Sequence, residues 1–161
     1  MLTLTTIDVE VPVDVAFDYY CDQASLQDWI PGGGILEFTP VTPPPKQVGS
    51  QFRIAYRSFG LTFRLLAEVK TLETNRLSVK ERVSGAYKSF RYEMHFTPTG
   101  PDSCRLDMRV SAELPGGVLG RLVMAPSAPF VRRDMQGGLA RFKARVEART
   151  PALAPVPVPV A

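Results

Sequence analysis

Residues 87–96 read YKSFRYEMHF, and their side chains alternate between two kinds. One parity is large and apolar or aromatic: Phe90, Tyr92, Met94 and Phe96. The other parity is polar, from Ser89 to His95. Successive side chains of a β-strand point to opposite faces, so this pattern predicts a strand with one dry face and one wet face. The dry face must contact either a packed core or a bound molecule.

The same alternation extends from Val48 to Leu114 and predicts a meander of antiparallel strands that share one apolar face. Two further strands are predicted earlier in the chain, over residues 3–11 and 35–41. Besides the strand quoted above, the residues assigned to the apolar face are Phe52, Ile54, Tyr56, Phe63, Leu65, Ala67, Val69, Leu77, Val79, Glu81, Val83, Cys104, Leu106, Met108, Val110, Ala112 and Leu114. An apolar face of this length needs a cover.

Helices are predicted in two places, and the longer one supplies that cover. A short helix capped by Asp14 follows the first strand, and a second short piece over residues 24–29 ends before Pro31. The long helix spans about residues 129–148. It carries an apolar stripe at helical spacing, which is typical of packing on a core: Val131, Met135, Leu139, Phe142 and Val146.

The length of 161 residues, 45% of them hydrophobic, fits one domain with a real core, which we assign to residues 1–149. Residues 150–161 are rich in proline and alanine and predict a disordered, extended tail. No leader or membrane-spanning pattern is recognised, and Cys21 and Cys104 lie too far apart in sequence to suggest a disulfide framework. A cytoplasmic location is the expectation; the sequence leaves the oligomeric state open.

Short motifs along the chain resemble those of a known superfamily. They are VPVDVAFDY at 11–19, WIPG at 29–32, VGSQF at 48–52, SG at 84–85, FTP at 96–98, ELPGG at 113–117 and LARFK at 139–143. Over residues 3–148 the chain resembles the SRPBCC superfamily, also called START-like or Bet v 1-like, in its polyketide cyclase/dehydrase-like branch. The resemblance implies an α+β helix-grip fold. In that fold a curved seven-stranded antiparallel sheet wraps around a long C-terminal helix, with two short helices after the first strand.

Proteins similar to this one hold small hydrophobic molecules in a cavity between the sheet and the long helix. The resemblance and the predicted parity together place these ligand-binding residues in its wall: Phe52, Ile54, Tyr56, Phe63, Leu65, Val79, Phe90, Met94, Met108, Val110, Asp134, Met135, Gly138, Leu139 and Phe142. A solid core built from the same side chains is the alternative. Consecutive Gly137 and Gly138 in the long helix either leave room for a ligand or allow close backbone packing.

Glu81 and Tyr92 are the candidate catalytic residues. Both share the dry parity, where a carboxyl or hydroxyl group could move a proton or hold a ligand oxygen. A strand end that breaks parity would instead leave Glu81 in water. His95, the only histidine, falls on the wet parity, so no zinc site, serine triad or cysteine–histidine pair can be assembled. We therefore expect no metal and no cofactor.

Two functions follow as hypotheses. The first is binding of a polyketide-like, aromatic or lipid-like molecule, with or without turnover as a cofactor-independent polyketide cyclase or dehydratase. The second is a non-catalytic accessory protein that binds lipid or quinone, or weakly contacts anionic membranes through the basic C-terminal helix. Nucleic acid is not expected as a partner, because this basic segment lacks interleaved aromatic residues. A fully packed domain that acts through protein contacts is a third reading.

Overall fold

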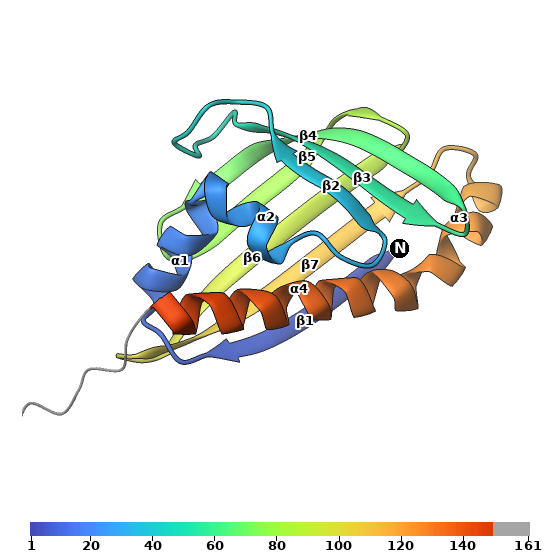
Figure 1. Cartoon of the computed structure of the whole chain (residues 1–161). Coiled ribbons are helices and arrows are strands. Elements are labelled where there is room, and N and C mark those ends of the chain that lie inside the picture. The colour runs from blue at the N-terminus through green and yellow to red at the C-terminus, as the bar shows by residue number, and fades with distance from the viewer. Residues whose placement is uncertain (150–161) are drawn as a thin grey trace, which may run out of the picture.

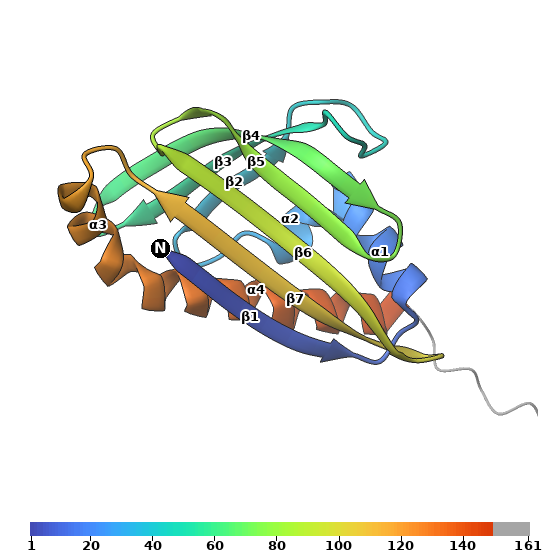
Figure 2. The same ribbon diagram turned by 180° about the vertical axis from the view of Figure 1, so that it is seen from behind.

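The computed structural model describes residues 1–149, and the predicted tail at residues 150–161 lies outside them. Its elements are β1 (Leu2–Val9), α1 (Val13–Cys21), the 3-10 helix η1 (Gln23–Ser25), α2 (Leu26–Trp29), β2 (Ile35–Pro40), β3 (Gln51–Ser58), β4 (Leu61–Glu73), β5 (Leu77–Gly85), β6 (Ser89–Gly100), β7 (Ser103–Glu113), α3 (Val118–Met124), η2 (Ala125–Ser127) and α4 (Ala128–Arg149). The strands form one antiparallel sheet in the order β1-β7-β6-β5-β4-β3-β2. Figure 1 shows this curved sheet around α4, so the predicted helix-grip fold is confirmed. Figure 2 shows the outer face of the sheet, with the helices behind it.

The quoted stretch forms β6 and has the predicted alternation. Tyr92 pairs with Val110 and Met94 with Met108 on β7, and all four side chains are buried. The alternate residues Arg91, Glu93 and His95 face the outer surface. The pairing buries one complete apolar face, because two strands of matching parity place their large side chains opposite one another.

Helix α4 packs on this face through the predicted stripe. Met135, Leu139, Phe142 and Val146 are buried, and Val131 is half-buried. The Phe142 ring contacts Trp29 of α2 edge to face, with the ring centroids 5.1 Å apart. The helix is thus fixed to the short helices as well as to the sheet. Among residues 1–149, no helix combines the length and apolar character needed to cross a bilayer.

The predicted parity of β5 is wrong. Two irregularities interrupt its pairing with β4, between Leu66 and Ala67 and between Val69 and Thr71. Each shifts the register, and a shift of one residue exchanges the two faces of a strand. On its other side β5 pairs regularly with β6: Lys80 pairs with Tyr92 and faces inward, whereas Glu81 pairs with Arg91 and faces outward.

The same correction applies to two apolar residues of β5. Val79 lies opposite Glu93 on the outer face, and Val83 is 41% exposed. The sequence could not reveal this, because Leu77, Val79 and Val83 imitate an inward parity. The extra residues of the two irregularities, Val83 in β5 and Lys70 in β4, carry no turn or glycine signal.

The predicted cap of the first helix is also wrong. Pro12 occupies the N-cap position without a side-chain hydrogen bond, and Asp14 lies inside the first turn. There its carboxylate accepts a hydrogen bond from the backbone N–H of Val15 at 3.0 Å. Proline before the first turn loses no hydrogen bond, and an acidic side chain near the helix N-terminus is favourable, so both residues suit the places they have.

We expect Phe142→Ala to lower the free energy of unfolding by about 3 to 5 kcal/mol, because it removes a fully buried ring. Urea denaturation followed by circular dichroism measures the change. Phe130→Ala on the same helix is the matched control, since the Phe130 side chain is 52% exposed. A loss in Phe142→Ala no larger than in the control would contradict the assignment of Phe142 to the core.

Candidate functional site

An apolar cavity of about 90 Å³ lies between the sheet, α2 and α4. Several residues named from the sequence line it: Ile54, Tyr56, Leu65, Phe90, Tyr92, Met108, Val110, Asp134, Met135 and Gly138. The inner parity and the helix stripe therefore surround a space as well as a core. That these residues bind a ligand stays a prediction.

Other predicted lining residues lie elsewhere. Phe52, Met94, Leu139 and Phe142 are at most 1% exposed and belong to the packed core. Phe63 borders a second, smaller space of about 20 Å³ near α3. Parity identifies the face on which these side chains lie, but only the packing of neighbouring rings decides where the space is left.

The sequence analysis missed part of the wall. The missing residues come mostly from the segment between α1 and β3 and from the chain start: Met1, Trp29, Ile30, Ile35, Phe38, Tyr87, Ala112 and Val131. Trp29 and Ile30 open the WIPG motif, so that motif was a usable signal. Trp29 is the only tryptophan of the chain and is 1% exposed.

Asp134 and Tyr56 form the mouth of the cavity. The Tyr56 hydroxyl donates a hydrogen bond to the Asp134 carboxylate at 2.9 Å, and the Gly34 backbone N–H donates to the same oxygen at 3.0 Å. Burial and the adjacent Asp134 raise the pKa of Tyr56 above its ordinary value. The mouth is thus closed by a hydrogen-bonded group from β3, α4 and residues 32–34, a run of three glycines that we call the glycine run.

The glycine run is explained by the closeness of this contact. A Cβ atom on Gly33 would lie 1.8 Å from Asp134 Oδ1, and the φ of Gly33 is +58°. A side chain at this position would therefore displace Asp134. The run borders an open groove of about 610 Å³, which shares Tyr56 and Asp134 with the cavity and is flanked by Arg57, Arg133 and Arg141.

Gly138 has a packing role. A Cβ atom there would lie 3.4 Å from the Trp29 carbonyl oxygen, so the helix backbone lies directly against α2. The same carbonyl accepts a hydrogen bond from Arg141 Nε at 3.0 Å. Gly138 also lines the cavity, so close packing and cavity formation occur at one residue.

Two buried lysines lie beside the inner wall of the cavity. Lys80 Nζ donates a hydrogen bond to the Tyr20 hydroxyl at 2.6 Å, and that hydroxyl donates to Ser78 Oγ at 3.1 Å. Lys46 Nζ donates to the Tyr20 carbonyl oxygen at 3.3 Å and lies 3.5 Å from the centroid of its ring. We call Lys46, Lys80, Tyr20, Ser78 and Tyr92 the lysine cluster.

The lysine cluster holds no counter-charge. Among the described residues 1–149, neither lysine forms an ion pair with a carboxylate. Burial lowers the pKa of Lys46 to about 8. Burial, together with the neighbouring Lys46, lowers the pKa of Lys80 well below its ordinary value. Two desolvated cations side by side are unfavourable, so at least one amine is neutral near pH 7.

The Tyr92 hydroxyl belongs to the same region. It interacts with that of Tyr20 but makes no hydrogen bond of ordinary geometry within residues 1–149. Burial raises its pKa well above the ordinary value for tyrosine. Tyr92 therefore stays protonated and keeps an unused donor.

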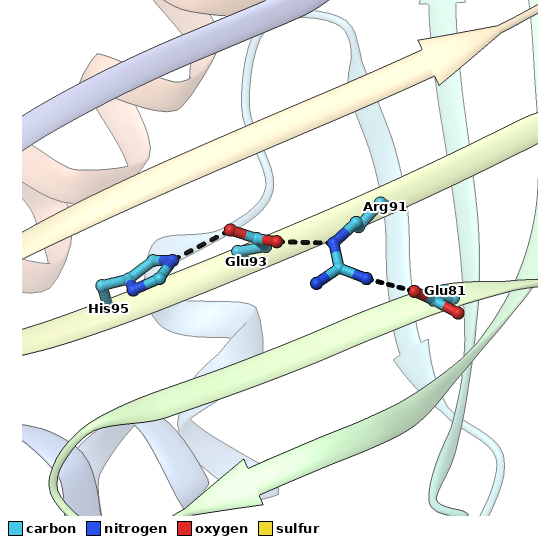
Figure 3. A network of polar contacts seen from close by, with 4 residues as sticks. All are labelled: Glu81, Arg91, Glu93 and His95. Carbon is cyan, nitrogen blue, oxygen red and sulfur yellow. Dashed lines mark hydrogen bonds and ion pairs between the residues drawn. The ribbon is translucent and has the colours of Figure 1, made fainter.

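Glu81, the other predicted catalytic residue, is not in the cavity. Figure 3 shows its carboxylate paired with Arg91 on the outer face of the sheet, in a row that continues through Glu93 to His95. His95 Nε2 lies 2.9 Å from a Glu93 carboxylate oxygen. A role for Glu81 as an acid or base in the cavity is therefore excluded by its position. Within residues 1–149, no three His, Cys, Asp or Glu side chains are grouped as a metal site would need.

The fold and the cavity together define a START-like domain of the helix-grip type. The chain belongs to the polyketide cyclase/dehydrase and lipid transport family, whose family model matches residues 3–147, and so to the SRPBCC superfamily. No curated protein sequence matches the chain.

Solved structures with the same fold include enzymes and proteins named only by superfamily. A Thermus thermophilus protein, TTHA0849, has 14% identity and a TM-score of 0.76, with 93% of this chain and 99% of that chain covered. The Zhui aromatase/cyclase from Streptomyces sp. R1128 has 14% identity and a TM-score of 0.72, with 97% and 99% covered. A START superfamily protein from Mycobacterium smegmatis has 17% identity and a TM-score of 0.69, with 92% and 99% covered. Identities this low show a shared fold.

We expect Lys46 to make a contribution to the free energy of unfolding that rises between about pH 8 and pH 10, so that the wild type gains stability over this interval relative to a variant without the amine. The pKa of Lys46 is about 8 in the folded protein against 10.5 in an exposed lysine, so over this interval the unfolded chain binds more protons. Stability rises with pH wherever the unfolded state holds more protons, here by on the order of 2 kcal/mol for Lys46. Urea denaturation at a series of pH values measures the slope.

Two variants make this measurement specific. Lys46→Met should flatten the slope, because the buried amine is gone. Lys70→Met should keep it, because the Lys70 side chain is 44% exposed. Equal slopes in all three proteins would contradict a buried, readily deprotonated Lys46.

Proposed function

We propose that this protein binds a small hydrophobic molecule, of an aromatic, polyketide-like or lipid-like kind, in the cavity between the sheet and α4. The observation that carries the proposal is a cavity lined by aromatic side chains. Among the described lining residues, the Tyr56–Asp134 pair is the only one joined by a side-chain hydrogen bond. Concave apolar space of this kind is the usual form of a small-molecule site. Membership of a family that includes polyketide cyclases and lipid transporters supports the same proposal.

The size of the cavity narrows the ligand. Its volume of about 90 Å³ is smaller than the roughly 150 Å³ of an apolar cavity that binds benzene. The proposal therefore places at most one ring or a short chain inside, with the rest of a larger molecule in the groove beyond Tyr56 and Asp134. The arginines flanking that groove would suit a ligand whose outer part is polar or anionic.

Catalysis is the finer part of the proposal. A cyclase or dehydratase of this fold would gain most of its acceleration by holding one conformer of a flexible chain, with a proton donor at the reacting oxygen. Tyr92 has the unused hydroxyl that such a donor needs. No cofactor is part of this proposal. We also propose a reducing, cytoplasmic location, which the free thiols of Cys21 and Cys104 support.

We expect 1-naphthol to change the fluorescence of Trp29, because Trp29 lines the cavity and is the only tryptophan. The titration should saturate. Ala112→Leu should weaken binding at least tenfold, because Ala112 is 2% exposed and the larger side chain would occupy the cavity. Ala144→Leu, on the exposed side of α4, is the matched control and should bind as the wild type does. Equal affinity in all three proteins would refute binding in this cavity.

A second candidate function is lipid handling at an anionic membrane, and an exposed apolar surface on α3 favours it. Val118, Leu119 and Leu122 are 71%, 72% and 65% exposed, and Arg121 lies between them. Arg132 and Arg133 on α4 follow closely in the chain and are also exposed. Apolar side chains beside arginines are typical of helices that lie at a membrane surface.

We expect the protein to sediment with vesicles containing phosphatidylserine at low salt and to release at high salt, because screening weakens attraction to an anionic surface. Leu119→Ser combined with Leu122→Ser should reduce sedimentation, whereas Leu36→Ser, at an exposed leucine of β2, should not. Failure to sediment at either salt concentration would remove this candidate.

A further inference from the structure

We propose that Lys80 is an amine nucleophile that captures the carbonyl group of an aldehyde or ketone held in the cavity, forming an imine. The inference rests on the proposed function, because the carbonyl compound is the hydrophobic ligand or part of it. It assigns a chemical class to that ligand and a reacting atom, Lys80 Nζ, to the protein.

Lys80 lies directly beside the cavity wall. In the sheet register Lys80 pairs with Tyr92, and Tyr92 pairs with Val110, so the three side chains form one row on the inner face. Tyr92 and Val110 both line the cavity. Lys80 Nζ is 4.7 Å from the centroid of the Tyr92 ring and 5.7 Å from that of Phe38, another residue of the wall. One layer of aromatic rings separates the amine from the space.

That layer consists of the rings of Phe38 and Tyr92, which contact each other with centroids 6.2 Å apart. Phe38 lies on β2, an edge strand that pairs only with β3. The Tyr92 hydroxyl makes no hydrogen bond of ordinary geometry within residues 1–149 and only lies next to that of Tyr20. Rotation of either ring is the movement that brings a ligand carbonyl to Lys80.

The surroundings of Lys80 favour a neutral amine with a free lone pair. Lys46 lies alongside, and desolvation next to a second cationic group is a known way to activate a lysine as a nucleophile. Lys80 Nζ donates to the Tyr20 hydroxyl, whose own proton is directed to Ser78 Oγ. The lone pair of Lys80 is therefore not taken up by Tyr20.

The proposed step is balanced with the groups of the lysine cluster. The Lys80 lone pair forms a bond to the carbonyl carbon while the π electrons of the carbonyl move to oxygen, which takes a proton from the Lys46 ammonium. A second proton passes from the Lys80 nitrogen to the hydroxyl group, and water leaves. The products are a protonated imine on Lys80, which carries the positive charge, a neutral Lys46 amine and one water molecule. No oxidant, reductant or cofactor enters the step.

A structural role for Lys80 predicts different contacts. Buried lysines kept for structure are normally paired with a carboxylate, because an isolated buried charge is costly. Lys80 is 1% exposed and contacts ring faces, a hydroxyl group and a second lysine instead. This arrangement suits an amine that must shed its proton.

The experiment is trapping with benzaldehyde, a small aromatic aldehyde with a single ring. The wild-type protein is incubated with benzaldehyde and sodium cyanoborohydride at pH 7, and the N-benzyl lysine formed is mapped by peptide mass spectrometry. We expect labelling at Lys80 at least tenfold above that at Lys70 and Lys88, two exposed lysines that serve as internal controls. Labelling of Lys70 and Lys88 with Lys80 unmodified would overturn the inference.

Variants test the role of the neighbouring charge. Lys46→Met should slow labelling of Lys80 severalfold at pH 7, because it removes the cation that favours the neutral amine. Lys80→Met should abolish the buried label without changing labelling of Lys70. An unchanged labelling rate of Lys80 in Lys46→Met would overturn the activation by Lys46. The sites labelled in the wild-type protein test the inference even if either variant is unstable.

Toluene separates this inference from the proposed function. Toluene has the same ring but no carbonyl, and its entry is followed by Trp29 fluorescence. Saturable binding of toluene without a Lys80 adduct from benzaldehyde would overturn the inference and leave the cavity function intact. A Lys80 adduct together with toluene binding supports both. Absence of both signals would overturn both.

Discussion

The position of α4 depends on one close contact, between the backbone at Gly138 and the carbonyl oxygen of Trp29. A Cβ atom at Gly138 would be at van der Waals distance from that oxygen, so a larger side chain would push the helix away from α2. Arg141 holds the same carbonyl by a hydrogen bond. With α4 against α2, Phe142 and Leu139 belong to the packed core, whereas Met135 and Gly138 line the cavity.

The lysine cluster lies beside the cavity wall, and its effect on stability differs from that of the packed core. When buried charged groups are replaced by hydrophobic residues of similar volume, the stability of a protein often stays unchanged or rises. Lys46 and Lys80 therefore lower the free energy of unfolding, because among residues 1–149 neither is paired with a carboxylate. Groups of this kind are concentrated at functional sites, where a shifted proton affinity is useful. The outer row from Glu81 to His95 is the contrast, since its charges are paired and partly solvated.

Much of the fold could be predicted from local pattern. Strands β3, β4, β6 and β7 show a plain period of two, and α4 shows a plain helical stripe, so element type and facing followed from hydrophobic periodicity. The prediction for strand β5 failed because its apolar residues do not mark its inner face and its pairing with β4 is irregular at two places, with one extra residue in each strand, Val83 and Lys70. The wall residues Trp29 and Phe38 were missed because they come from short segments without a repeat.

The sequence by itself determined that one apolar sheet face meets one apolar helix stripe, because both are set by the spacing of side chains along a single segment. Only the tertiary structure decided where that contact leaves space and which polar groups lie beside it. Tyr20, Lys46, Lys80 and Tyr92 come from α1, the loop after β2, β5 and β6, and their approach depends on strand register and helix placement together. Proximity between such distant segments has no local signal, so the lysine cluster is visible only in three dimensions.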